Sequence, residues 1–183
     1  MKKIIQTILG GELISSVLLS VFRNQPLVVL YHGVTGRNTS EGIENYRGKH
    51  VSKETFRSQV LLLKNRFDVV PLQEIEMLAK KRTVPARPLC AITFDDGYRN
   101  NYTNAFPILK ELGLPATIFL TTGFIDRKFP LWPDALEISI GRTESGVARV
   151  QWEKDTEMYR LDTLGEKKRA DMQIRARLKT LSA

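Results

Sequence analysis

The sequence predicts an α/β fold, a partial (β/α) barrel with about four parallel strands, flanking helices and a further N-terminal helix. Short apolar runs rich in β-branched residues alternate with segments whose apolar residues recur every three or four positions. This alternation is typical of parallel βαβ units with right-handed crossovers. A closed eight-stranded barrel takes about 250 residues, whereas the chain has 183. Four strands therefore indicate either a small open sheet or the front part of a larger barrel.

The four predicted strands are short apolar runs bounded by loop residues: LVVLY at 27–31, FDVV at 67–70, LCAITF at 89–94 and ATIFLT at 116–121. The third run is apolar almost throughout, which is typical of a strand that is buried on both faces. It contains Cys90, the single cysteine of the chain. A disulfide framework is therefore excluded, and we expect Cys90 to be a small buried hydrophobic residue.

Helical spacing marks the segments between these strands. Ser52 can cap a helix whose apolar residues follow at spacings of four, three and four, at Phe56, Val60, Leu63 and Phe67. Further helices are predicted for 72–81 and for 100–112, the second ending at Gly113. The segment from His32 to about His50 contains several glycines and polar residues, so we expect a loop there.

The chain beyond the fourth strand predicts a different arrangement. LWPDALEISI at 131–140 has a helical pattern, and the runs on either side of Asp155 are suited to a small hairpin. Near the C-terminus, GEKKRADMQIRARLKTL carries much of the formal net charge of +8. Its apolar residues fall at helical spacing, so we expect a solvated helix with one apolar stripe, formed by Ala170, Ile174 and Leu178. No zinc finger or RNA-binding signature accompanies the charge, and we therefore exclude nucleic acid as a partner.

Residues 1–25 are predicted to form an apolar or amphipathic helix that precedes a domain at 26–183. Two lysines come before the apolar segment, as in a secretory signal, but Glu12 interrupts it and no small-residue cleavage site follows. Its uninterrupted part, Leu13 to Phe22, is shorter than the roughly 20 residues of a spanning helix. We expect this helix to contact a membrane surface through residues 2–22 or to pack on the domain. This favours the cell envelope or a membrane over the cytoplasm, without fixing the location.

TFDDGY at 93–98 is the stretch that indicates chemistry. Asp95 and Asp96 stand at the C-terminal end of a predicted buried strand, where α/β folds bind ligands. Adjacent carboxylates repel each other, and a divalent cation would resolve this repulsion. One carboxylate could then hold the metal while the other takes a proton from metal-bound water. The alternative is that Asp95 caps the following helix and Asp96 makes a turn hydrogen bond.

At these residues the sequence resembles the polysaccharide deacetylases, carbohydrate esterase family four. VVLYHGVT at 28–35, HVSKETFRSQVLLLKNRFDVVPLQEI at 50–75 and ILKELGLPATIFLTTGFID at 108–126 are similar to family segments around TFDDGY. The resemblance implies a partial barrel of the deacetylase type and a metal-dependent hydrolase, usually with zinc, that removes acetyl groups from N-acetylated sugars in a polysaccharide. It implies that Asp95 is the general base and that Asp96 is a metal ligand. His32 and Tyr98 are candidate substrate-binding residues, with a satisfied loop histidine and simple packing as their alternatives.

The sequence departs from the family pattern in its histidines. The family's metal site takes two histidines from a motif of the form His-Ser/Thr-x-x-His, whereas this chain has only His32 and His50. A catalytic zinc normally has three protein ligands. We therefore expect the chain to be a fragment of a deacetylase that is incomplete and inactive alone. The alternative is a non-catalytic glycan-binding or degenerate deacetylase-like protein.

Overall fold

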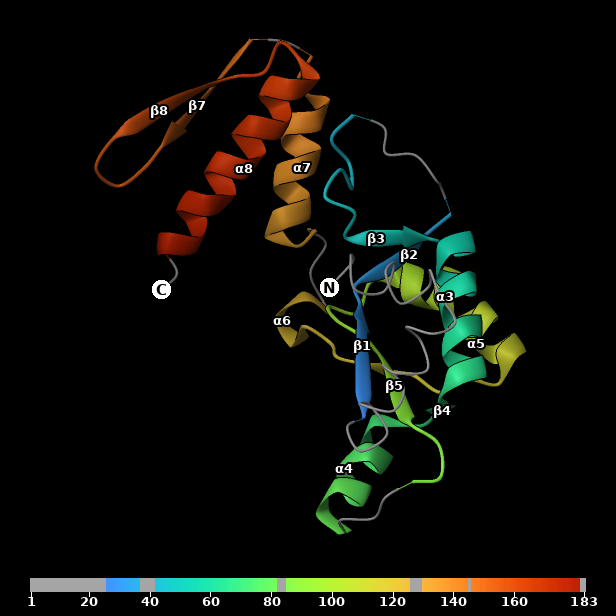
Figure 1. Ribbon diagram of the computed structural model, residues 1–183. Coiled ribbons are helices and arrows are strands. Elements are labelled where there is room, and N and C mark those ends of the chain that lie inside the picture. Colours follow the sequence, from blue (N-terminus) through green and yellow to red (C-terminus); the bar gives the residue numbers. More distant parts are fainter. Residues whose placement is uncertain (1–25, 37–41, 82–84, 126–129, 145, 182–183) are drawn as a thin grey trace, which may run out of the picture. The chain divides into compact units, whose positions relative to one another are not determined.

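A computed structural model describes residues 26–36, 42–81, 85–125, 130–144 and 146–181 (Figure 1). The predicted N-terminal helix and its membrane-contact segment, residues 2–22, lie outside these ranges. None of the helices in the described ranges is long and apolar enough to cross a membrane. The described residues form two compact units. The first unit contains residues 26–36 and the described residues of 50–120, and the second contains residues 42–49 and the described residues from 121 onward. The expectation of one domain over 26–183 stays a prediction.

A parallel sheet of four strands forms the first unit, as the sequence predicts. Strand β5 (Leu89–Phe94) is central and pairs with β1 (Leu27–Tyr31) along its length. Its other edge pairs with β4 (Asp68–Val69) near its start and with β6 (Thr117–Ile118) near its end. Strands β4 and β6 are each two residues long, shorter than their apolar runs predict. All six residues of β5 are buried, which explains why its sequence is apolar throughout.

Helices pack against β5 from more than one side, with α3 (Lys53–Arg66) and α5 (Phe106–Leu112) beside the strands and α4 (Leu72–Lys81) near their lower end in Figure 1. On one face, α3 and α5 join a core that contains Cys90, Ile92 and Phe94. On the other face, Leu89 and Ala91 pack with α4. The prediction for Cys90 is confirmed, because its side chain is fully buried.

The predicted cap and apolar face of α3 are both present. The Ser52 hydroxyl accepts a hydrogen bond from the backbone N–H of Thr55 at 3.1 Å. Phe56 packs edge-on against Tyr31, with ring centroids 5.0 Å apart, and both rings lie within 6 Å of Phe94. Aromatic contacts of this kind add about 0.5–1.5 kcal/mol to the burial of the rings. They anchor α3 beneath the C-terminal end of β5.

Two local features of this unit differ from the sequence prediction. The region expected to be a loop holds two short parallel strands, β2 (Gly33–Thr35) and β3 (His50–Ser52). The helix predicted at 100–112 begins as a π-helical turn, η1 (Asn101–Ala105), before it continues as α5. Its predicted end is confirmed, since Gly113 has a φ of 65°.

The second unit contains α6 (Thr122–Ile125), α7 (Trp132–Arg142), the β7–β8 hairpin (Val147–Gln151 and Thr156–Arg160) and α8 (Leu164–Leu181). The antiparallel hairpin around Asp155 confirms the sequence prediction. The buried core of this unit takes residues from α7, β8 and α8 and from the segments beside them: Ile43, Ile140, Trp152, Tyr159, Leu161, Ala170 and Ile174. Ala148 and Val150 of β7 are partly buried against it. Two of the three residues of the predicted apolar stripe on α8 are therefore buried.

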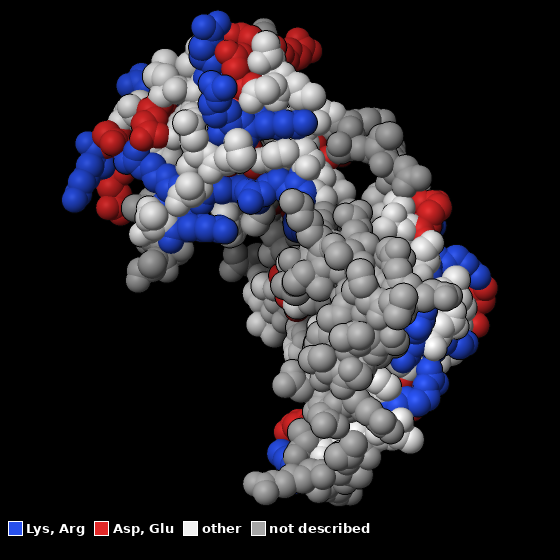
Figure 2. All heavy atoms as spheres, in the orientation of Figure 1, with Lys and Arg blue, Asp and Glu red and all other residues white. Residues whose placement is uncertain are grey.

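The prediction that the charged residues of α8 are solvated is wrong for Arg175, which is only 9% exposed. Its guanidinium donates to Asp171 at 2.7 Å and to Glu137 of α7 at 2.9 Å. Asp171 also accepts a hydrogen bond from the Tyr46 hydroxyl at 2.7 Å. Figure 2 shows Lys and Arg side chains gathered on the visible face of this unit, so the solvated interpretation fits other cations there. Arg175 differs because it is buried between two carboxylates, Asp171 of its own helix and Glu137 of α7.

Candidate functional site

The two aspartates of TFDDGY follow directly after the buried central strand. The backbone N–H of Asp95 donates to the carbonyl of Tyr31 at 2.9 Å, which extends the pairing of β5 with β1 by one residue. Both Asp95 and Asp96 are half-buried. The helical segment that follows begins at Arg99 and continues into η1, and Asn100, which precedes η1, forms no side-chain capping bond. The structure thus places the pair at the sheet edge that the sequence predicts.

The backbone turns sharply within this motif. Asp96 has a φ of 71° and Gly97 a φ of 70°, both in the left-handed region. A Cβ on Gly97 would lie 2.5 Å from the Leu120 Cδ2 atom, so glycine meets both a conformational and a steric requirement there. For Asp96 the left-handed conformation costs about 1–2 kcal/mol. Strain of this kind persists where the surroundings enforce it, and it is frequent at functional sites.

His32 lies beside the aspartates because β1 and β5 end together. Tyr31 pairs with Phe94, so the residues that follow the two strands emerge next to each other. The Nε2 atom of His32 lies 4.0 Å from Oδ2 of Asp96, and the two side chains are 36% and 29% exposed. The structure therefore brings together two of the residues that the sequence singled out, at a surface that solvent reaches.

Tyr98 packs edge-on against the ring of His50, with centroids 4.8 Å apart and an interplanar angle of 85°. This contact fits the packing alternative for Tyr98. The Nδ1 atom of His50 lies 3.1 Å from Nδ2 of Asn100. Sequence reasoning did not select His50 or Asn100 as site residues. The pairing of β2 with β3 is the signal that would have found His50, and the sequence alone does not reveal that pairing.

Comparison with known proteins identifies the part of the chain that holds this motif. Residues 82–161 match the family model described as polysaccharide deacetylase. This matched region, less than half of the chain, is similar to the polysaccharide deacetylase family. The match includes β5, the aspartate turn and the β7–β8 hairpin, so the matched region contains residues of both compact units.

Curated relatives are similar to an overlapping part of the chain. Over 113 residues, 56% of its length, this chain is 35% identical to a poly-β-1,6-N-acetyl-D-glucosamine N-deacetylase of Staphylococcus aureus. It is 28% identical over 111 residues, 60% of the chain, to the YxkH protein of Bacillus subtilis. These matches span 38% and 37% of the relatives' own lengths. The IcaB structure from Ammonifex degensii is 27% identical and has a TM-score of 0.48, with 63% of this chain and 48% of that chain covered.

The residues that the structure describes do not complete a metal centre. It contains no group of three or more His, Cys, Asp or Glu side chains that could hold a metal ion. His32 and Asp96 come nearest to a pair of ligands, but a tetrahedral zinc would place two donor atoms about 3.3 Å apart, whereas these lie 4.0 Å apart. Catalytic zinc also needs a third protein ligand. The described residues alone therefore do not fit a catalytic zinc.

Burial removes two other candidate nucleophiles from consideration in the first unit. Burial raises the pKa of the Cys90 thiol to about 12. Burial also raises the pKa of the Tyr31 hydroxyl, and that hydroxyl donates to Gln59 at 3.0 Å. Neither group forms an anion at neutral pH, so neither is a candidate nucleophile.

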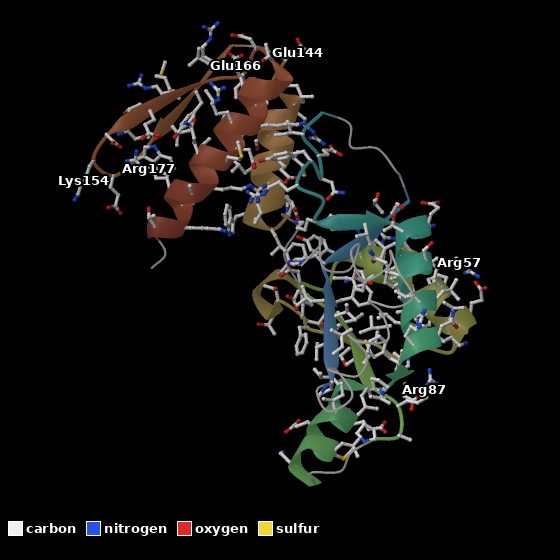
Figure 3. All side chains as sticks on the ribbon, viewed as in Figure 1. Arg57, Arg87, Glu144, Lys154, Glu166 and Arg177 are labelled. Atoms are coloured by element: carbon white, nitrogen blue, oxygen red, sulfur yellow. The ribbon has the colours of Figure 1, made fainter. Side chains whose placement is uncertain are left out.

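The second unit has an open groove of about 780 Å³ between β8 and α8. Arg177 of α8 lines it and points toward the hairpin (Figure 3). The guanidinium pairs with Asp155 and Glu157 and lies over the Trp152 ring, 4.5 Å from its centroid. The charged groups on this wall of the groove therefore already pair with one another and hold the hairpin against α8.

Proposed function

We propose that this chain carries part of the active site of a deacetylase that hydrolyses the acetamide C–N bond of N-acetylated sugars in a polysaccharide. In this proposal Asp95 is the general base and Asp96 is a ligand of a divalent metal, zinc. One observation carries it: the two carboxylates lie at the C-terminal end of the central strand, within a family-matched region and with His32 at 4.0 Å from Asp96.

The reaction requires a base, because water must lose a proton as it attacks the acetyl carbonyl. Asp95 is half-buried at the strand end and can accept that proton. The water oxygen bonds to the carbonyl carbon, the C–N bond breaks, and the amine nitrogen gains a proton. The products are acetate and a free amino sugar. His32 is one-third exposed, and we propose that its imidazole binds the sugar at the entrance to the site, with Tyr98 supporting the same wall.

The metal requires further ligands beyond Asp96. Because the described residues offer no third donor, we propose that the missing ligands come from outside this set. The 183-residue chain by itself should then release no acetate.

The substrate class follows from the reaction and from the relatives. The Staphylococcus aureus relative is named for poly-β-1,6-N-acetyl-D-glucosamine. We propose that this chain belongs to a protein that acts on a polymer of N-acetylated hexosamines, with no part for nucleic acid.

Acetate release tests the proposal. The longest polypeptide that the reading frame of this chain encodes is incubated with N-acetylglucosamine oligomers and zinc, with and without a chelator. Acetate release that the chelator abolishes is expected, and Asp95→Asn should lower it at least about 100-fold, the usual contribution of a general base. Asp96→Asn should abolish the response to zinc. Asp68→Asn is a matched control, because Asp68 pairs with Arg87 at the start of β4, far along the strand direction from the aspartate turn. Absence of acetate release from a polypeptide with an intact TFDDGY motif and a second histidine motif would refute the proposal.

The absence of a three-donor group among the described side chains favours one alternative, a glycan-binding protein without catalysis. This alternative expects the 183-residue chain to bind the same oligomers without added metal. Isothermal titration with the chain, in the presence of a chelator, separates the two proposals.

A further inference from the structure

A polar cluster follows the aspartate turn, and its residues His50 and Asn100 have no part in the chemistry proposed above. It consists of Gly33, His50, Tyr98 and Asn100, all in the first unit. His50 contacts both of the others that carry side chains: its ring meets Tyr98 edge-on, and its Nδ1 atom lies 3.1 Å from the Asn100 amide nitrogen. These two partners come two and four residues after Asp96, so His50 contacts the exit of the turn.

Strand register brings His50 to this place. Strands β2 and β3 are parallel, and Gly33 pairs with His50. A Cβ on Gly33 would lie 2.1 Å from His50 Nδ1 and 2.4 Å from Asn100 Oδ1. The imidazole and the amide are therefore packed directly on the backbone next to His32. A glycine is required here for close approach rather than for its φ, since Gly33 is not among the residues with positive φ.

The turn is thus held on two sides. On its entry side, the N–H of Asp95 donates to the Tyr31 carbonyl at 2.9 Å. On its exit side, the N–H of Asn101 donates to the Tyr98 carbonyl at 2.9 Å, and His50 packs on the same residue. Between the two sides Asp96 has its left-handed backbone, a conformation that persists only where the surroundings impose it.

We propose that His50 is a positioning residue that fixes the Asp95–Asp96 turn through Tyr98 and Asn100. The effect of His50 on catalysis rests on the proposed function. Its effect on the conformation of the turn does not depend on that function. His50 does not touch the reacting groups. Its contact with Asn100 is a hydrogen bond when Nδ1 carries no proton, because the amide nitrogen can only donate. Glutamine can replace this acceptor with its side-chain oxygen, whereas alanine cannot.

Hydrogen exchange in the full 183-residue chain tests the proposal without any need for activity. The amide protons of Asp95 and Asn101 are measured by NMR in the wild type, in His50→Ala, in His50→Gln and in Asn104→Ala. Asn104 is the matched control, because its Nδ2 donates to the Val34 carbonyl at 2.7 Å and so also connects η1 to β2. His50→Ala should speed exchange at Asn101 about tenfold, the effect of losing roughly one hydrogen bond. His50→Gln should restore most of the protection, and Asn104→Ala should leave Asn101 within about twofold of the wild type.

Exchange at Asn101 that is equal in His50→Ala and Asn104→Ala, or that His50→Gln fails to restore, would overturn the proposal. If His50→Ala does not fold, Asn100→Ala removes the same hydrogen bond from the other side and takes its place with the same expected result. In the longest encoded polypeptide, His50→Ala should lower kcat about tenfold with KM within about twofold, and His50→Gln should recover kcat. A wild type that releases no acetate would refute the proposed function, while the exchange data would still decide the role of His50.

Discussion

Replacing Gly97 by alanine probes the aspartate turn most directly. Gly97 has a φ of 70°, and a Cβ there would lie 2.5 Å from Leu120 Cδ2. Gly113 offers a matched comparison in the same unit, because its φ is 65° and a Cβ there would meet nothing within 4 Å. Both substitutions force an alanine into a left-handed backbone conformation. Only Gly97→Ala also brings a Cβ into steric conflict with Leu120.

The magnitudes follow from these two terms. An alanine in the left-handed region costs about 1–2 kcal/mol, so Gly113→Ala should lower the free energy of unfolding by about that amount. Displacing a packed side chain costs about 1–3 kcal/mol more. Leu120 can yield by rotating, because its colliding atom is the end of a flexible and 57% exposed side chain. We therefore expect Gly97→Ala to lower the free energy of unfolding by about 1 kcal/mol more than Gly113→Ala does, at the lower end of that range.

Labelling of Cys90 in urea reports the unfolding of the first unit, which also contains Gly97. Cys90 is the single cysteine and is fully buried in β5, whereas both tryptophans, at 132 and 152, belong to the other unit. The urea concentration at which a thiol reagent gains access therefore reports the unfolding of the sheet that carries the aspartates, and linear extrapolation converts it to a free energy. A Gly97→Ala variant as stable as Gly113→Ala would show that Leu120 does not restrict the turn, and the reasoning would fail.

Three further predictions concern the rest of the chain. Arg175→Ala should destabilise the second unit by about 3–5 kcal/mol, measured by tryptophan fluorescence in urea, because it leaves Asp171 and Glu137 buried without their cation. Ser52→Ala should cost about 1 kcal/mol by Cys90 labelling, since it removes the observed cap of α3. Burial raises the pKa of Cys90 to about 12, so the folded state holds the thiol proton more tightly than the unfolded state. Stability from this group is therefore complete below about pH 8.5 and falls as the pH rises toward 12, and Cys90→Ala should remove that part of the slope in urea titrations at pH 8 and pH 10.

Local sequence signals predicted those elements whose stability depends on neighbours within a few residues. The cap at Ser52 and the apolar spacing at Phe56 and Val60 act within one helix, and both are present in α3. The continuous apolar run at 89–94 predicted a strand buried on both faces, and all six residues of β5 are buried. The position of Asp95 and Asp96 after that strand followed from the run that precedes them.

Contacts between segments that lie far apart in the sequence were not predicted or were predicted wrongly. Strands β2 and β3 are three residues each, too short for a pattern to separate them from the polar loop around them. Arg175 was expected in solvent because its own helix shows only a charged face, yet it is buried and pairs with Glu137 of α7. A sequence pattern on one helix cannot show which side chains another helix brings.

The sequence by itself therefore determined the α/β class, the four parallel strands, the β7–β8 hairpin and the location of the two aspartates, because each depends on spacing and burial along a continuous stretch. Only the tertiary structure decided that His32 lies 4.0 Å from Asp96, that Asp96 has a left-handed backbone and that His50 packs on Tyr98 and Asn100. Those facts depend on strand register and on close approach between segments that lie 17 to 64 residues apart. Register is set by the packing of the whole unit, and no single stretch of sequence carries it.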